Sequence, residues 1–195
     1  TVYGLRYAYR ISGMKEMRVV LPSIERPKKL PVVLGRNEVR RLLRAPKLLK
    51  HRLVLAMLYG CGLRNFELCN LQLKDLDLER MMLHIRQGKG RKDRYVPLCA
   101  MQVRGLRKYI SAERPVTWCF NGNDSKGGPV ALSARGVQWI VKEARKHSGI
   151  QKEVTTHSLR HSYATHLLEM GLDIISVKDL LGHADIQTTL TYLHV

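Results

Sequence analysis

The chain has 195 residues, of which 34 are Lys or Arg and 16 are Asp or Glu, so its formal net charge is +18. A hydrophobic fraction of 45% at this length suffices for one substantial buried core, which excludes wholesale disorder. The apolar runs are far shorter than the roughly 18 residues that a membrane-spanning helix needs. Such a charge favours a polyanionic partner, nucleic acid first, with an anionic membrane surface or an acidic protein as alternatives.

The positive charge is densest at the start of the chain, where residues 1–50 hold 13 Lys or Arg and three acidic residues. Three prolines, at positions 22, 27 and 31, interrupt regular structure among basic side chains. We therefore predict a basic linker over residues 21–33. Residues 1–20 are predicted to contain the last helix of a truncated N-terminal domain, and residues 34–195 the main domain. Because the first residue is Thr1 and not Met, we expect a processed protein or part of a longer one.

From residue 34 onward, the apolar residues recur mostly at helical spacing. Asn37 is a candidate cap for the first helix. Between residues 73 and 98 the apolar residues alternate around a glycine-containing loop, which predicts a small antiparallel sheet with a hairpin. Residues 121–129 are rich in Gly, Pro, Asn and Asp and are predicted to form a loop. Further helices are predicted over residues 49–60, 64–71, 100–113, 133–147, 157–170, 174–181 and 186–193.

A first candidate site is a predicted helix whose spacing places His157, Arg160 and His161 on one face. An arginine fork with imidazole donors suits a phosphate. Zinc is an alternative, but Arg160 would hold a positive charge beside the metal and the H-E-x-x-H motif is absent. A solvated polar helix face is a further alternative.

The cysteines lack metal-site spacing and are interpreted as reduced, partly buried thiols. They are Cys61, Cys69, Cys99 and Cys119.

Two further segments carry positive charge next to glycine. Residues 88–94 hold four cations and one acid in the predicted hairpin loop, whose glycines would let Lys89 approach a phosphate closely. A solvated loop tip would explain the same composition. Arg64 follows a Gly-Cys-Gly-Leu break at the start of a predicted helix, where free main-chain N–H groups and the helix dipole favour an anion. An ordinary helix-capping turn is the alternative there.

Taken in order, these pieces resemble the tyrosine recombinases of the phage-integrase and Xer type. The resemblance covers roughly residues 34–195 and implies an α+β, mainly helical catalytic domain with a small antiparallel three-stranded sheet. Six motifs carry it. They are Gly62-Leu63-Arg64 with Glu67, Gly88-Lys89-Gly90, His157-x-x-Arg160-His161 with Ala164-Thr165-His166-Leu167-Leu168, Leu181-Gly182-His183, Thr188-Thr189, and Tyr192-Leu193-His194.

The resemblance implies site-specific recombination of double-stranded DNA, through a 3′-phosphotyrosyl intermediate and a Holliday junction. It implies no metal, no ATP and no other cofactor, no membrane, and a cytoplasmic, nucleoid-associated location. The implied catalytic residues act together at one phosphodiester. They are Arg64 and Arg160 as a phosphate clamp, Tyr192 as nucleophile, His157 as base and later acid, His183 as hydrogen-bond donor to the phosphate, and Lys89 as acid for the leaving 5′-oxygen.

Glu67 and His161 match supporting positions of the family. DNA contacts are expected at Arg26, Lys28, Lys29, Arg91, Lys92 and Arg94, with a solvated position as the alternative for Lys92 and Arg94. The chain ends three residues beyond Tyr192, where related proteins continue, so a tetramer on paired sites is expected of the full-length protein.

Two other functions remain open from the sequence. A type IB topoisomerase shares the tyrosine chemistry but relaxes DNA without exchanging strands. A DNA-binding module without catalysis would explain the charge, but it gives no reason for the six implied catalytic residues to occur together.

Overall fold

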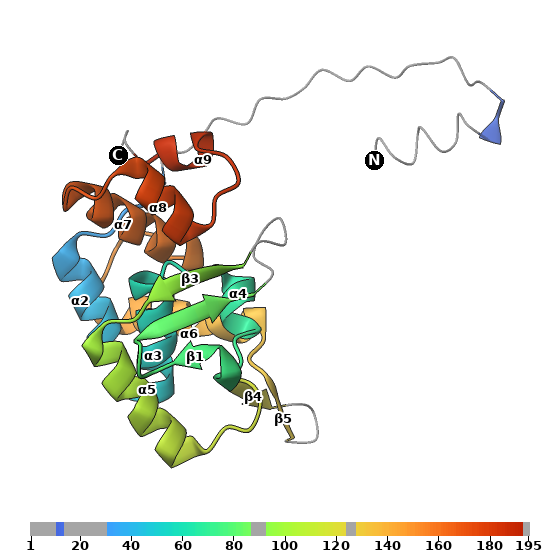
Figure 1. Cartoon of the computed structure of the whole chain (residues 1–195), viewed down its shortest axis with the longest axis vertical. Coiled ribbons are helices and arrows are strands. Elements are labelled where there is room, and N and C mark those ends of the chain that lie inside the picture. The colour runs from blue at the N-terminus through green and yellow to red at the C-terminus, as the bar shows by residue number, and fades with distance from the viewer. Residues whose placement is uncertain (1–10, 14–30, 87–92, 124–127, 193–195) are drawn as a thin grey trace.

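The computed structural model describes residues 11–13, 31–86, 93–123 and 128–192 (Figure 1). Most of the predicted N-terminal helix and linker, and the tip of the predicted hairpin, therefore lie outside the described residues.

At the start of the main domain, Leu34 is fully buried, and its N–H donates a hydrogen bond to Oγ of Ser162 at 2.9 Å. This bond ties the beginning of the domain to a helix 128 residues further along the chain.

Helix α2 (Arg36–Arg44) begins before the predicted cap. Its N-cap is Gly35, whose N–H donates to the carboxylate of Glu38 at 2.8 Å. The prediction that Asn37 caps this helix is therefore wrong. A carboxylate three residues into the helix reaches back to the N-cap and supplies the capping bond instead.

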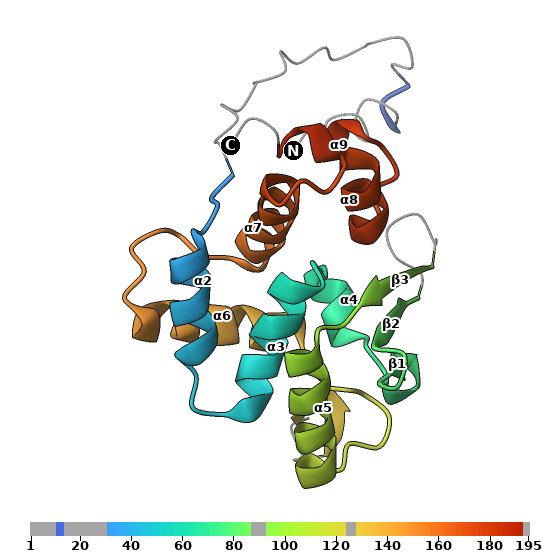
Figure 2. The same ribbon diagram turned by 60° about the vertical axis from the view of Figure 1, so that its left-hand side comes forward.

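Helix α3 (Leu49–Gly60) lies at the centre of the main core, with helices α2, α5, α6 and α7 packed against it (Figure 2). Helix α5 (Ala100–Glu113) approaches it closely, because a Cβ on Gly105 would lie 2.8 Å from Cδ2 of Leu53. Helix α6 (Ala134–Ser148) starts at the cap Ser133, whose side chain accepts a bond from the N–H of Gly136. The predicted bounds of α3 and α5 are confirmed.

The predicted antiparallel sheet is confirmed, with strand order β1-β2-β3. Its strands are β1 (Leu76–Asp77), β2 (Met82–Ile85) and β3 (Arg94–Pro97). Leu83 pairs with Leu76 on one side and Val96 on the other, and alternation turns Leu83 and Val96 into the core. The loop predicted over residues 121–129 contains a second hairpin, of β4 (Asn121–Asn123) and β5 (Pro129–Ala131). These two short strands were not predicted, because the segment is rich in turn-forming residues and lacks the β-branched alternation that marks longer strands.

Three C-terminal helices form a separate group above α3, α4 and β3 in Figure 2. They are α7 (Thr156–Glu169), α8 (Ile174–Leu181) and α9 (Gln187–Leu190). Thr155 caps α7, and a small apolar cluster joins the group. That cluster consists of Tyr163, Ala164, Val177, Leu181 and Tyr192.

Between this group and the sheet lies helix α4 (Asn65–Cys69), with Arg64 at its N-cap.

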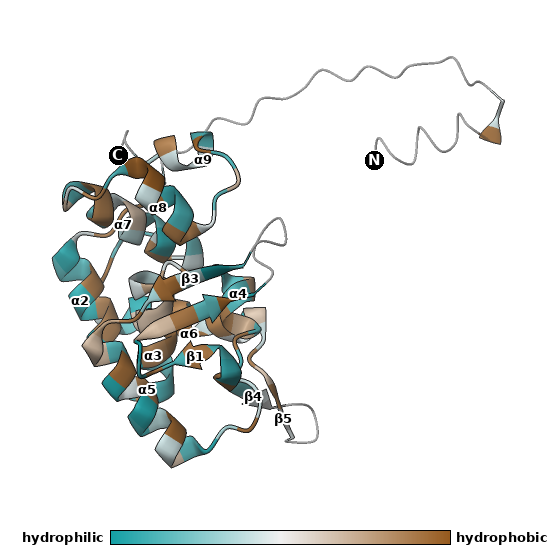
Figure 3. Ribbon diagram, in the orientation of Figure 1, coloured by the Kyte–Doolittle hydropathy of each residue, from teal (hydrophilic) through white to brown (hydrophobic). Residues whose placement is uncertain are grey.

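The helices of the domain carry hydrophilic and hydrophobic residues side by side, as expected for elements packed on one face (Figure 3). Within the described part of the chain, no helix has both the length and the apolar content needed to cross a membrane. The described cysteines form no disulfide, and Cys99 is exposed while Cys61, Cys69 and Cys119 are buried.

Candidate phosphate-binding active site

A pocket of about 240 Å³ opens between the C-terminal helices and α4. It brings together six of the residues predicted from the sequence to act at one site, and it joins Arg64, at the start of α4, to residues of the C-terminal part of the chain. The lining residues are Arg64, His157, Arg160, His161, His183, Ala184, Asp185, Thr188 and Tyr192. The predicted site residues Lys89, Arg91, Lys92, Arg26, Lys28 and Lys29 lie outside the described residues.

Arg64 reaches the pocket from the N-cap of α4. Its Nη1 donates to Oε1 of Glu67 at 2.8 Å, and its Nη2 donates to the carbonyl of Gly182 at 3.0 Å. Glu67 also accepts a bond from the Arg64 main-chain N–H at 2.8 Å. The capping turn proposed as an alternative for this segment therefore exists, and it also holds the side chain of Arg64 at the pocket.

Arg160 is buried, with 4% of its surface exposed. Its Nη1 donates to the carbonyl of Gly62 at 2.5 Å, and its Nη2 donates to the carbonyl of Leu181 at 2.7 Å. Burial lowers its pKa to about 10, and the nearby charge of Arg64 acts in the same direction. The guanidinium thus remains charged at neutral pH, and the charge of Glu67 favours that state. A phosphate in the pocket would favour it further.

The C-terminal end of α8 organises the arginines. The carbonyls of Leu180, Leu181 and Gly182 each accept a hydrogen bond from a different arginine, namely Arg94, Arg160 and Arg64 in that order. Carbonyls at a helix C-terminus lack partners within the helix and carry a partial negative charge, so they attract cations. Because main-chain carbonyls leave no side-chain pattern, this arrangement could not be found in the sequence.

Arg94 lies in a different place from the one expected of it. Its side chain is 9% exposed, and its guanidinium binds both oxygens of Glu67 at 2.8 Å. It therefore neither stands in solvent nor presents a free fork to DNA. Alternation along β3 explains the difference, since Arg94 shares the inward face of the strand with the buried Val96.

Glu67 carries the negative charge of this arginine cluster. Burial alone would raise its pKa, but its bonds to Arg94 and its proximity to that charge outweigh burial and, with the bonds from Arg64, lower the pKa to about 2. Glu67 is therefore ionised at neutral pH. These contacts are consistent with the supporting role that the family resemblance implies for Glu67.

His183 follows Gly182, whose left-handed conformation (φ +63°) ends α8. Gly182 is the C-cap of α8 and turns His183 toward the pocket. Nδ1 of His183 is 2.8 Å from Oγ1 of the buried Thr189. Burial, together with the charges of Arg160 and Arg64, lowers the pKa of His183 to about 4, so the ring is neutral at neutral pH. Thr189 belongs to one of the six motifs, but no individual role was predicted for it.

Tyr192 is buried, with 4% of its surface exposed. Its ring contacts His161 at a centroid distance of 5.1 Å and His183 at 6.0 Å. Burial raises the pKa of the Tyr192 phenol, while the positive charge of Arg160 opposes that rise. Burial also lowers the pKa of His161, and so do the neighbouring His157 and Arg160. His157 is exposed at the pocket rim.

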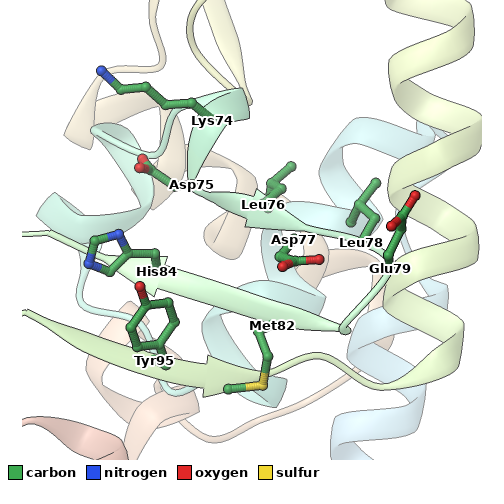
Figure 4. A pocket seen from close by; sticks show the side chains of 9 residues that line it. All are labelled: Lys74, Asp75, Leu76, Asp77, Leu78, Glu79, Met82, His84 and Tyr95. Atoms are coloured by element: carbon green, nitrogen blue, oxygen red, sulfur yellow. The ribbon is translucent and has the colours of Figure 1, made fainter.

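A larger hollow, of about 440 Å³, lies on the outer face of the sheet. Figure 4 shows the carboxylates of Asp75, Asp77 and Glu79 there, beside the stacked rings of His84 and Tyr95. The three carboxylates outnumber the one lysine of the lining, Lys74, so this hollow is a poor candidate for a polyanion. Within the described residues, no group of three His, Cys, Asp or Glu side chains is arranged to hold a metal ion.

Residues 33–195 match the phage integrase family. The chain belongs to that family. Among curated proteins, this integrase is 39% identical over 196 residues to the tyrosine recombinase XerA of Thermococcus kodakarensis, covering 100% of this chain and 69% of XerA. The relatives carry the name tyrosine recombinase, which favours strand exchange over the topoisomerase alternative.

Solved structures agree with this assignment. The integrase resembles a crystal structure of XerA recombinase with a TM-score of 0.78 and 30% identity, covering 100% of this chain and 69% of that one. It also resembles the XerH site-specific recombinase bound to its palindromic difH substrate in a post-cleavage complex, with a TM-score of 0.73, 27% identity, and coverage of 93% and 54%. The fold expected from the family resemblance is confirmed.

Proposed function

We propose that the pocket between α4 and the C-terminal helices holds the scissile phosphate of a DNA recombination site, and that Tyr192 is the nucleophile. One observation carries the proposal: a buried tyrosine contacts two imidazoles beside two arginines whose positions are set by main-chain carbonyls. A tyrosine that served packing alone would not need two arginines and two imidazoles around it. DNA is the polyanion that the charge of +18 and the DNA-bound relative XerH both favour.

In the proposed reaction, Oη of Tyr192 attacks the phosphorus, a Tyr–O–P bond forms, and the P–O5′ bond breaks. His157 receives the phenolic proton, and Lys89 gives a proton to the leaving 5′-oxygen. A 5′-hydroxyl of another strand then reverses these steps and releases Tyr192. Because the phosphotyrosyl bond conserves the energy of the phosphodiester, the exchange needs no ATP.

Arg64 and Arg160 would contact the non-bridging oxygens, on which negative charge grows in the transition state. Their carbonyl partners fix them before the substrate arrives, so little reorganisation is required during the reaction. The hydroxyl of Thr189 is proposed to donate to Nδ1 of His183. The proton of the neutral ring then resides on Nε2 and is available to the phosphate.

The test traps the covalent intermediate. The 195-residue chain would be incubated, with EDTA present, with nicked duplexes that tile the DNA on both sides of its own coding sequence. A nick lets the released fragment diffuse away and so prevents rejoining. We expect a covalent protein–DNA adduct on a denaturing gel, at a 3′-phosphate.

Tyr192→Phe should bind the same duplex with similar affinity and form no adduct. A chain that binds one of these duplexes specifically but forms no adduct on it would overturn the catalytic proposal and favour a binding module. An adduct that persists in Tyr192→Phe would assign the nucleophile to another residue.

A further inference from the structure

We propose that Arg94 is a positioning residue of the recombination reaction, which holds Arg64 and His183 in a common arrangement by bridging Glu67 and the C-terminal end of α8. The inference rests on the proposed function of the pocket. It differs from a DNA-contact role, which the sequence alone suggested for Arg94. It is also distinct from catalysis, since Arg94 is absent from the residues that line the pocket.

The contacts of Arg94 join three elements. From the first position of β3, its Nε donates to the carbonyl of Leu180 at 2.9 Å. Its Nη1 and Nη2 donate to Oε1 and Oε2 of Glu67, each at 2.8 Å. This is the two-pronged geometry that the rigid guanidinium offers and that a lysine lacks. One side chain thereby ties the sheet to both α4 and α8.

The contact with α8 extends to the residue before His183. A Cβ placed on Gly182 would lie 3.0 Å from both Cδ and Nη1 of Arg94, so the arginine packs directly on the glycine backbone. The carbonyl of the same glycine accepts the bond from Nη2 of Arg64. A shift of Arg94 is therefore transmitted to the main chain that orients His183 and Arg64.

Arg94 and Arg64 share the carboxylate of Glu67. Oε1 of Glu67 accepts a bond from Nη1 of each arginine. Without Arg94, both carboxylate oxygens would face Arg64 alone. A two-pronged pair between Arg64 and Glu67 would then compete with the bond from Arg64 to Gly182 and turn its fork away from the phosphate position.

A purely stabilising role is the weaker account of this arrangement. Buried ion pairs are poor sources of stability, because the cost of desolvating both charges offsets their attraction. Their better use is to fix geometry. Arg94 also adds a third cation near Arg64 and Arg160, and the repulsion among these charges further reduces what its ion pair contributes to stability.

The test compares Arg94→Gln and Arg94→Lys with a matched control, Arg86→Gln. Arg86 lies just after β2 on the same hairpin and pairs with the buried carboxylate of Asp75 at 2.5 Å, away from the pocket. Single-turnover cleavage of the nicked duplex, DNA affinity at several salt concentrations, and thermal unfolding would be measured for each. We expect Arg94→Gln to slow cleavage by about 10- to 100-fold, the order expected of an ångström-scale misplacement.

DNA affinity should separate positioning from phosphate contact. We expect the slope of log affinity against log salt to be unchanged in Arg94→Gln, whereas loss of a phosphate contact would reduce it by about one. Arg94→Lys should recover only part of the cleavage rate, because it restores the charge but not the fork. Arg86→Gln should cleave at the rate of the unmodified chain, even if its unfolding temperature falls.

A double-mutant cycle with Glu67→Gln tests the route of the effect. If Arg94 acts through Glu67, the double variant should cleave little more slowly than the slower single variant. Additive losses, a cleavage rate in Arg94→Gln equal to that of the unmodified chain, or a reduced salt slope would each overturn the inference. If Arg94→Gln does not fold, Arg94→Lys carries the same cycle.

The two proposals fail in different ways. No adduct from the unmodified chain or from Arg86→Gln, on a duplex that both bind, would remove the proposed function and this inference with it. An adduct from the unmodified chain and from Arg86→Gln, together with normal cleavage by the Arg94 variants, would overturn the inference about Arg94 and leave the proposed function intact.

Discussion

The ring of His161 meets the ring of Tyr192 at a centroid distance of 5.1 Å and an interplanar angle of 60°. Such edge-on contacts between rings are favourable beyond the area they bury. Helix α9, which precedes Tyr192, has only four residues and offers little rigidity of its own. The position of Tyr192 therefore depends on side-chain packing from α7 and on His183.

The first prediction concerns this ring contact. His161→Ala leaves the phenol of Tyr192 free to turn, and we expect cleavage to fall by up to about 10²-fold. His161→Phe keeps a ring in place and should stay within about tenfold of the unmodified rate, because the contact is one of shape. Single-turnover cleavage of the nicked duplex measures both. Nδ1 of His161 has no hydrogen-bond partner among the described residues, so equal losses in both variants would assign the role to that nitrogen instead.

The second prediction concerns the partner of His183. Thr189→Val keeps the buried volume but removes the hydroxyl that lies 2.8 Å from Nδ1 of His183. We expect a loss of about 1 kcal/mol in the free energy of unfolding and a three- to tenfold slower cleavage, since the proton is no longer directed to Nε2. Thr189→Ser retains the hydroxyl and is the matched control. Urea unfolding and single-turnover cleavage would be measured for both variants. Equal stability and equal cleavage rates of Thr189→Val and Thr189→Ser would contradict the prediction.

Much of the framework of the site could be predicted from the sequence. Helical spacing on α7 correctly placed Arg160 and His161 beside each other at one pocket, and a Gly-Cys-Gly-Leu break correctly marked the helix start at Arg64. These signals are local, because they follow from the period of a helix and from the chemistry of its first turn. The same kind of signal located the three-stranded sheet.

Much of the rest depends on contacts between distant segments. Arg94 looked like an exposed cation in a charged hairpin, since no local pattern reveals Glu67, which lies 27 residues earlier. The carbonyls at the end of α8 were missed for the same reason. Thr189 lies only six residues from His183, but the residue types alone do not predict the hydrogen bond between them. Asn37 was chosen as a cap from residue type alone, while the bond from Gly35 to Glu38 decides where α2 begins.

The third prediction concerns the glycine whose carbonyl holds Arg160. Gly62 has φ +57°, and a Cβ there would lie 2.6 Å from Cδ1 of Tyr163. We expect Gly62→Ala to lose about 2–5 kcal/mol of unfolding free energy, from left-handed strain and overpacking together. Cleavage should also fall, because the displaced carbonyl is the acceptor for Arg160.

Gly149→Ala is the control for backbone strain. Gly149 has a similar φ of +68°, ends α6, and would place its Cβ with no atom within 4 Å. It should lose only about 1–2 kcal/mol and cleave normally once folded. Unfolding by urea together with cleavage of the nicked duplex distinguishes the two. Equal effects on cleavage would show that the carbonyl of Gly62 has no particular role.

The last prediction concerns stability and pH. The pKa of His183 is lowered from 6.5 to about 4 in the folded chain, first by burial and then by the charges of Arg160 and Arg64. Between these two values the unfolded chain binds the proton more readily, so the free energy of unfolding should fall as the pH drops from 6.5 toward 4. The lowered pKa values of His161 and His166 act in the same direction. Urea unfolding at pH 7.5, 6.0 and 5.0 should show a steady loss, with a shallower slope in His183→Asn. A stability that is constant from pH 7.5 to 5.0, or a slope unchanged by His183→Asn, would mean that His183 is not held neutral by this pocket.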